Sequence, residues 1–160
     1  MSSPYQLQES DSYSYEFTTD FKVKYHIYFI DYAYMFYDYE HITCPFYSFN
    51  IDVIDGSTRG VAEDVRIRQT VLHVFQLFFE KVDNVAIYVC DSLDERQLAR
   101  KRKFDLWFSS FKNEMVIKLD GVATVEGVSI YNAILVHRNN KEVTEIESAF
   151  NDLNKIASDK

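Results

Sequence analysis

Hydrophobic and polar residues alternate along the first third of the chain with a period of two, which is typical of half-buried strands. The alternation covers residues 13–17, 21–29 and 47–53, where the apolar positions are mostly Tyr, Phe, Ile and Val. The pattern therefore predicts three strands, with a short turn at residues 18–20 between the first two. Residues 31–43 fit a helical turn and an irregular loop equally well.

The middle of the chain predicts two helices and a buried strand. Apolar residues in 62–82 recur at helical spacing, and the nearly continuous apolar run 85–90 is typical of a strand covered on both faces. A capping box formed by Ser92 and Glu95 indicates the start of the second helix. The buried stripe of this helix is expected to contain Phe104, Trp107, Phe108 and Phe111.

The last third of the chain predicts a hairpin, a further strand and a helix. Apolar segments at 115–119 and 122–125 flank Asp120–Gly121, a dipeptide that is typical of two-residue hairpin turns. Residues 128–136 predict another strand. Apolar residues from Val143 to Ala157 have the spacing of a C-terminal helix.

The order of these elements predicts an α+β fold with a mostly antiparallel sheet. The order is three strands, helix, strand, helix, two or three strands, and helix, and Asn139 and Glu142 are a plausible pair of caps for the last helix. The polar residues 1–12 are expected to form a flexible tail. Residues 13–158 are expected to form a single domain, which suits a chain of 160 residues.

Charge is unevenly distributed along this acidic chain, whose formal net charge is −8. Most of the cations lie in residues 56–113, whereas residues 1–55 have only Lys22 and Lys24. The net negative charge makes general binding to nucleic acids or anionic membranes an unfavourable hypothesis. Because the N-terminal residues lack the features of a secretion signal and no apolar run could cross a bilayer, we expect a cytoplasmic protein.

The two cysteines, Cys44 and Cys90, are too few for a disulfide framework and lie in apolar segments, so we expect buried, reduced thiols. Cys90 and Arg96 have the spacing of cysteine phosphatases, in which a thiolate and a helix N-terminus bind phosphate. The acidic residues between Cys90 and Arg96 would repel a phosphate. We therefore do not predict phosphatase activity.

No catalytic residue, metal site or cofactor is predicted. Asp91 and Asp94 could hold a divalent ion together with Asp64, but the first two are better explained as a turn residue and a helix-start residue. The four histidines lack the spacing of metal ligands. The sequence also lacks a Gly-rich phosphate loop, a serine nucleophile elbow and a dinucleotide-binding motif.

A polar patch is expected around the two helices and the buried strand. Helical projection places Arg100 beside the aromatic stripe, where it should pair with Asp64 or Asp91. Arg66 and Arg68 are two residues apart and cannot share a helix face, so one of them should reach Asp91. These five residues would form either a structural network or a site.

Outward-facing cations are expected on the second helix at Arg96, Arg102 and Lys103. They would form either a solvated surface or a face that docks an acidic partner. Most of the twelve tyrosines precede Phe49, and tyrosine suits partly wet interfaces, so we also consider a homodimer contact.

Three segments, Asp64–Val71, Phe78–Phe79 and Tyr88–Phe108, carry a resemblance that extends over nearly the whole chain. They resemble a family of short bacterial proteins of unknown function. The resemblance implies a single-domain bacterial protein and no particular activity.

The order of elements is also similar to the core of the GCN5-related N-acetyltransferases, which has a meander of strands, a helix, a buried strand, a helix and a closing hairpin. In those enzymes, amides of a Gly-rich turn at the first of these helices hold the pyrophosphate of coenzyme A. The matching stretch here, residues 59–66, has one glycine and two acidic residues. The resemblance implies an acetyltransferase-like fold and, as an alternative function, acyl transfer from coenzyme A.

The function we expect first is a non-catalytic interaction or regulatory module that binds a protein partner. A toxin-neutralising or defence-associated role would suit a small acidic protein. Acyl transfer is the second hypothesis, and nucleic-acid binding through the basic helix is the third.

Overall fold

The computed structural model describes residues 3–60, 64–90, 96–109 and 115–159. Within these residues the chain is α+β, with three α-helices and a mixed seven-stranded sheet of order β1-β2-β3-β4-β5-β7-β6. β4 and β5 pair in parallel, whereas β1–β2, β2–β3, β5–β7 and β6–β7 are antiparallel. The predicted class and the order of elements are confirmed, with one short N-terminal strand in addition.

The chain divides into two compact units, which are described separately. Unit 1 contains Met1–Ile30 and Phe49–Glu80, and unit 2 contains Asp31–Ser48 and Lys81–Lys160. Strand β4 (Phe46–Asp55) contributes its first residues to unit 2 and the others to unit 1.

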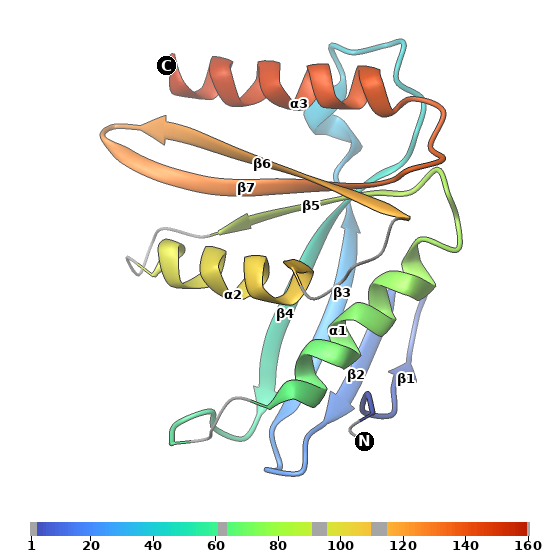
Figure 1. Ribbon diagram of the computed structural model, residues 1–160, viewed down its shortest axis with the longest axis vertical. Helices are drawn as coiled ribbons and strands as arrows, with labels where there is room; N and C mark the ends of the chain where they lie inside the picture. Colours follow the sequence, from blue (N-terminus) through green and yellow to red (C-terminus); the bar gives the residue numbers. More distant parts are fainter. Residues whose placement is uncertain (1–2, 61–63, 91–95, 110–114, 160) are drawn as a thin grey trace. The chain divides into compact units, whose positions relative to one another are not determined.

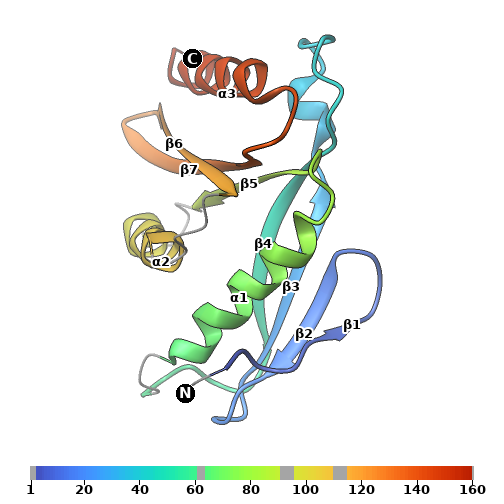
Figure 2. The ribbon, with the colours of Figure 1, turned by 45° about the vertical axis from the view of Figure 1, so that its right-hand side comes forward.

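Unit 1 combines a small antiparallel sheet with one helix (Figures 1 and 2). Its elements are β1 (Gln8–Glu9), β2 (Ser14–Thr18), β3 (Lys24–Asp31), most of β4, and α1 (Val65–Phe78). The predicted alternation holds on β2 and β3, because the aromatic and aliphatic residues at every second position are buried: Tyr15, Phe17, Tyr25, Ile27 and Phe29.

Aromatic rings fill the core of unit 1. The Phe29 ring of β3 contacts Phe49 of β4 and Phe75 of α1, with centroid distances of 5.6 and 5.7 Å. Phe78 approaches Phe29 to 4.1 Å. These contacts explain the helical spacing of apolar residues in α1, since that face of the helix covers the sheet.

Helix α1 begins after Asp64, whose side chain caps it. Asp64 Oδ1 accepts a hydrogen bond from the Arg66 amide at 2.9 Å, which satisfies one of the free N–H groups at the helix start. The helix ends at Phe78, earlier than the predicted residue 82. The predicted start at residue 62 lies outside the described residues.

The segment expected to be a flexible tail makes specific contacts within unit 1. Tyr5 is only 5% exposed, its amide donates to Thr70 Oγ1 at 2.8 Å, and its hydroxyl donates to Asp64. Gln8 and Glu9 form β1 against β2. Sequence periodicity could not indicate this, because one buried ring and a two-residue strand are too short to produce a pattern.

Unit 2 is built around three antiparallel strands with a helix on each face (Figure 1). Its elements are a short 3₁₀ helix η1 (Ala33–Phe36), β5 (Val85–Cys90), α2 (Gln97–Ser109), β6 (Val116–Val125), β7 (Val128–His137) and α3 (Val143–Ser158). The segment 31–43, which the sequence left undecided, therefore contains a single helical turn.

Strand β5 is covered on both faces, as its apolar run predicts. Val85 and Ile87 pack in one core with Ile146 and Phe150 of α3. On the opposite face, Tyr88 stacks on a ring of α2.

The hairpin turn predicted at Asp120–Gly121 is wrong. β6 continues through this dipeptide, and the turn follows at Glu126 and Gly127, whose φ angles of 52° and 80° suit a tight hairpin. Gly121 instead allows a close approach, because a Cβ atom there would lie 2.8 Å from Cζ of Phe150. The glycine is needed for packing against α3 rather than for a turn.

Of the predicted cap pair of α3, Asn139 and Glu142, only Glu142 lies at the start of the helix, and its side chain does not cap the helix. Glu142 is the N-cap residue, but its side chain makes no capping bond. Its carboxylate accepts hydrogen bonds from the amide and hydroxyl of Thr43 instead. Asn140, and not Asn139, supplies the local bond, since its Oδ1 accepts from the Glu142 amide at 2.8 Å.

Candidate functional site

Aromatic rings hold α2 against β5 in unit 2. Tyr88 stacks on Phe104 with centroids 4.2 Å apart, and Phe104 meets Trp107 edge to face at 5.2 Å. Trp107 and Phe108 are buried, which agrees with the predicted aromatic stripe. Phe111 and the predicted capping box at 92–95 lie outside the described residues.

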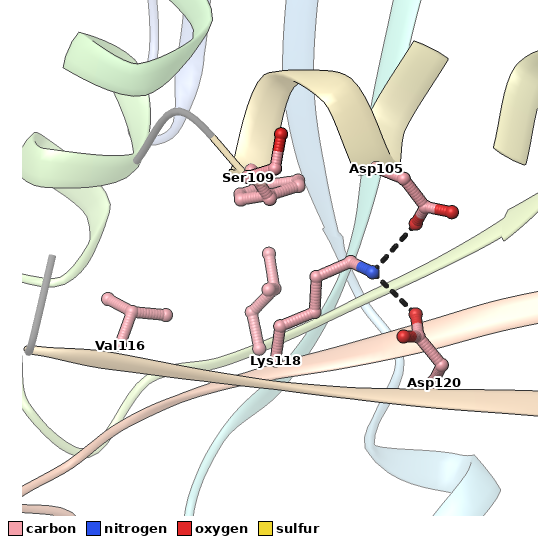
Figure 3. Close-up of a pocket in the computed structure, with 7 residues that line it drawn as sticks. Asp105, Ser109, Val116, Lys118 and Asp120 are labelled. Carbon is pink, nitrogen blue, oxygen red and sulfur yellow. Dashed lines mark hydrogen bonds and ion pairs between the residues drawn. The ribbon is translucent and has the colours of Figure 1, made fainter. Parts of the chain in front are cut away.

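A pocket of about 300 Å³ lies between the C-terminal half of α2 and β6 (Figure 3). Its walls are formed by Phe108, Ser109, Val116 and Leu135, and its charged groups are Asp105, Lys118 and Asp120. The Lys118 amine points between the two carboxylates, 2.8 Å from Asp105 and 2.5 Å from Asp120.

A second lysine joins the same network from α2. Lys101 Nζ lies 2.5 Å from Asp105 and 5.9 Å from the centre of the Tyr131 ring. Burial would raise the pKa of Asp105, but hydrogen bonds from Lys101 and Lys118 outweigh it, so the pKa lies below its ordinary value. The bond to Asp105 raises the pKa of Lys101. Both partners are therefore held in their charged forms.

The paired charges limit the chemistry of this pocket. An amine that acts as a nucleophile must be neutral, and a carboxyl that acts as an acid must be protonated. The ion pairs favour the opposite states for Lys101 and Asp105. The network suits a structural role, which is to fix the orientation of α2 on β6.

The sequence pattern did not indicate Asp105 or Lys118 as site residues, and it indicated Asp120 only as a turn residue. Two local signals were available, because Lys101 and Asp105 have the i, i+4 spacing of a helix pair and Lys118 and Asp120 share one face of a strand. The contact between α2 and β6 gives no local signal, since it depends on how the two elements pack.

Neither cysteine has the properties of a nucleophile. Both are free and buried, as expected. Burial, followed by the hydrogen bond to Glu142, raises the pKa of the Cys44 thiol to about 12. Burial also raises the pKa of Cys90, which opposes the thiolate that a phosphatase requires.

The cations predicted to dock a partner, Arg96, Arg102 and Lys103, are exposed. Lys103 also contacts an aromatic ring, since its Nζ lies 5.2 Å from the ring centre of Trp107. Their role in partner binding stays a prediction.

Two exposed leucines accompany these cations on α2. Leu98 is 43% exposed and Leu106 is 44% exposed, and both are spaced four residues from Arg102. Residues four apart lie on one side of a helix, so Leu98, Arg102 and Leu106 form one line, which we call the outer row. The leucines were not predicted from the sequence because the cations around them hide the apolar spacing.

The predicted polar patch is divided between the two units. Asp64, Arg66 and Arg68 belong to unit 1, Arg100 belongs to unit 2, and Asp91 lies outside the described residues. The patch as a whole therefore stays a prediction.

Within unit 1, Arg66 contacts the N-terminal segment. Its Nη1 lies 3.0 Å from an Asp20 carboxylate oxygen, and its Nε donates to the Ser3 carbonyl at 2.7 Å. The guanidinium also lies over the Tyr5 ring, 3.9 Å from its centre. These contacts give Arg66 a structural role in holding residues 3–5.

In the part of the chain that the structure describes, no three or more His, Cys, Asp or Glu side chains are grouped closely enough to hold a metal ion. Asp91 and Asp94, which the sequence suggests as ligands alongside Asp64, lie outside that part. Nor does any described helix have the length and apolar character needed to cross a membrane.

Comparison with known proteins places the chain in a family without assigning an activity. No curated protein and no solved structure matches the sequence. A family model matches residues 63–152, which include α1, β5, α2, β6, β7 and most of α3. The chain belongs to this family, DUF6169, a family of unknown function.

Proposed function

We propose that this chain is a non-catalytic interaction module that binds an acidic protein partner through the outer row of α2 and its neighbouring cations. The observation that carries the proposal is the exposure of Leu98 and Leu106 in line with Arg102. A partner that covers the row would bury both leucines, and apolar anchors ringed by polar groups are common in protein interfaces.

The charges of α2 favour an acidic partner. Asp105, the only acidic residue in α2, is bonded to Lys101 and Lys118. An acidic surface on the partner would complement Arg96, Arg102 and Lys103 and would increase the rate of association.

A matched pair of charge reversals tests the proposal. Arg102→Glu changes the outer row, and Lys155→Glu makes the same change at an exposed position of α3. We expect a nuclease-treated lysate of the source cells to yield an acidic protein that the wild type and Lys155→Glu capture. With the purified partner, Arg102→Glu should weaken binding roughly tenfold.

The melting temperature separates docking from stability. It should be the same for Arg102→Glu and the wild type, because an exposed side chain contributes little to folding. Equal capture by all three proteins would refute the docking role. Capture that disappears after nuclease treatment would favour the third hypothesis, nucleic-acid binding.

Acyl transfer from coenzyme A is the second candidate. It is favoured by the parallel pairing of β4 with β5 in a sheet whose other described pairs are antiparallel, with α1 connecting the two strands. This connection agrees with the acetyltransferase-like order of elements. The candidate has weaker support because the Asp64 carboxylate already occupies the Arg66 amide at the start of α1, where the pyrophosphate would bind.

A thermal-shift titration with coenzyme A distinguishes the two candidates. Saturable stabilisation would favour acyl transfer, since a ligand that binds only the folded state raises its stability by mass action. Unchanged melting at all concentrations would favour the interaction module.

The proposal extends to a bacterial, cytoplasmic protein with a toxin-neutralising or defence-associated role. The bacterial origin is what the resemblance of Asp64–Val71 and Tyr88–Phe108 implies, and the toxin-neutralising or defence-associated role is based on the small size and the net charge of −8. The genes encoded beside this one provide the most direct test, because proteins of such systems are commonly encoded next to their partners.

A further inference from the structure

Strand β6 is the edge strand of the sheet on the unit 2 side. It pairs with β7 without interruption, from Val116 opposite His137 to Val125 opposite Val128. The strand contains no proline and no bulge, two of the features that commonly prevent an edge strand from pairing further, and the charged residues at its edge, Lys118 and Asp120, have opposite signs.

Two hydrogen bonds show which backbone groups of β6 point away from β7. The Arg138 amide donates to the Met115 carbonyl at 2.7 Å, so odd-numbered residues bond to β7. The Thr124 amide instead donates to Ser158 Oγ at 3.0 Å, which places even-numbered residues on the outer side.

Four consecutive even-numbered residues therefore present their backbone amides and carbonyls at the outer edge: Val116, Lys118, Asp120 and Val122. The described hydrogen bonds include no partner for these groups. Such a row of groups is a template for one more antiparallel strand.

We propose that this edge pairs with the β6 edge of a second copy of the chain, antiparallel and related by a twofold axis at Leu119. Lys118 of each copy then lies opposite Asp120 of the other, and Val116 lies opposite Val122. The same patch on both copies forms the contact, as a twofold dimer requires.

The charges select this register. Only even-numbered residues can bond across the edge, so an even-numbered residue must lie opposite an even-numbered residue of the second copy. The twofold axis of the dimer can then lie at any residue of the strand, for example at 118, 119 or 120. An axis at residue 118 would place Lys118 opposite its copy, and an axis at residue 120 would do the same for Asp120. Like charges directly opposite destabilise a strand pair, whereas opposite charges stabilise it.

The intramolecular ion pairs are compatible with this contact. Lys118 keeps Asp105 and Asp120 of its own chain as partners, and its side chain is still 18% exposed. The Asp120 carboxylate, with a side chain 56% exposed, is accessible to the lysine of the second copy. This dimer is independent of the docking role proposed for α2.

A backbone test uses Val122→Pro with Val122→Thr as its matched control. Proline removes the outward amide and is tolerated at a sheet edge, whereas threonine keeps both the amide and the branched shape. By light scattering at several concentrations, the wild type and Val122→Thr should be dimers and Val122→Pro a folded monomer.

A charge test follows from the register. Asp120→Lys and Lys118→Glu each place like charges opposite one another, so each variant alone should be monomeric. A mixture of the two should form a heterodimer, because both opposed pairs become complementary again.

The result that would overturn the proposal is a monomeric wild type, or a folded Val122→Pro that is still a dimer. If a variant fails to fold, hydrogen exchange of the wild type decides. The amides of Lys118 and Asp120 should exchange slowly at high protein concentration and faster on dilution. Exchange that does not depend on concentration would exclude the contact.

Discussion

Helices α3 and α2 cover opposite faces of the same three strands in unit 2 (Figure 1). The two helices differ in where their buried residues lie along the sequence. In α3 the buried residues Ile146, Ala149 and Phe150 recur at helical spacing. In α2 the buried residues are Trp107 and Phe108, both in its last turn.

This difference agrees with the docking role that we propose for α2, whereas the buried residues of α3 cover the sheet. The buried apolar residues of α3 are spaced towards the strands, and Ile156 near its end is 45% exposed. The first turns of α2 place Leu98 in solvent and contribute no buried side chain.

The largest effect is expected from truncating the buried face of α3. Phe150→Ala should lower the free energy of unfolding by about 3 to 5 kcal/mol, because it leaves a cavity in the core that includes Phe46 and Ile134. Urea denaturation followed by circular dichroism measures the loss. A change below about 1 kcal/mol would mean that α3 is not the main cover of this face.

A smaller effect is expected on the strand that α3 contacts. Gly121→Ala should cost about 1 to 3 kcal/mol, because the new methyl group would overlap Phe150 and Asn132. Thr124→Ala, an exposed position of the same strand, is the control and should cost less than about 0.5 kcal/mol. Equal losses for both would show that α3 can move away at no cost.

The carboxylate that precedes α3 should make stability depend on pH. Glu142 is 7% exposed; burial would raise its pKa, but hydrogen bonds from Cys44 and Thr43 outweigh it and lower the pKa below the ordinary 4.5. The stability that the charged Glu142 carboxylate contributes to the folded state is thus complete above pH 4.5. It is lost as the pH falls through the lowered pKa of the folded state.

Glu142→Gln should cost about 1 kcal/mol at neutral pH, and the difference from the wild type should shrink below the ordinary pKa of the carboxyl. Urea midpoints measured at neutral and acidic pH provide the check. A difference that does not change with pH would mean that the carboxylate charge contributes nothing.

The smallest effect is expected at the outer row of α2. Leu98→Ala and Leu106→Ala should each change the free energy of unfolding by less than about 0.5 kcal/mol, since both side chains are largely in solvent. Partner capture should nevertheless fall. A loss of stability comparable to that of Phe150→Ala would remove the contrast between the helices.

The two Asp–Gly dipeptides show how far the sequence could predict the fold. Asp55–Gly56 lies at the end of β4, and Gly56 has a φ angle of 84°. Asp120–Gly121 has the same residues within similar apolar neighbours, yet it lies inside β6. The local preference for a turn is overridden there by the packing of Phe150, which no local pattern records.

In the candidate site, too, local patterns were predictable and contacts between distant segments were not. The aromatic residues of α2 were predictable because helical spacing brings Phe104 and Trp107 to one side. The ion pair between Asp105 and Lys118 joins a helix to a strand, so it becomes visible only with the packing of the two elements. The N-terminal Tyr5 is a comparable case in unit 1, since its partners Asp64 and Thr70 are far away in sequence.

Unit 2 is discontinuous in sequence, and this has a consequence for biosynthesis. Residues 31–48 leave the ribosome early, but Phe36 and Phe46 complete their core only with Ile146 and Phe150 of α3. The core around the early segment therefore stays incomplete until α3 is made. Nascent chains that lack α3 should expose these rings to chaperones, and folding of unit 2 should be completed only after most of the chain has been translated.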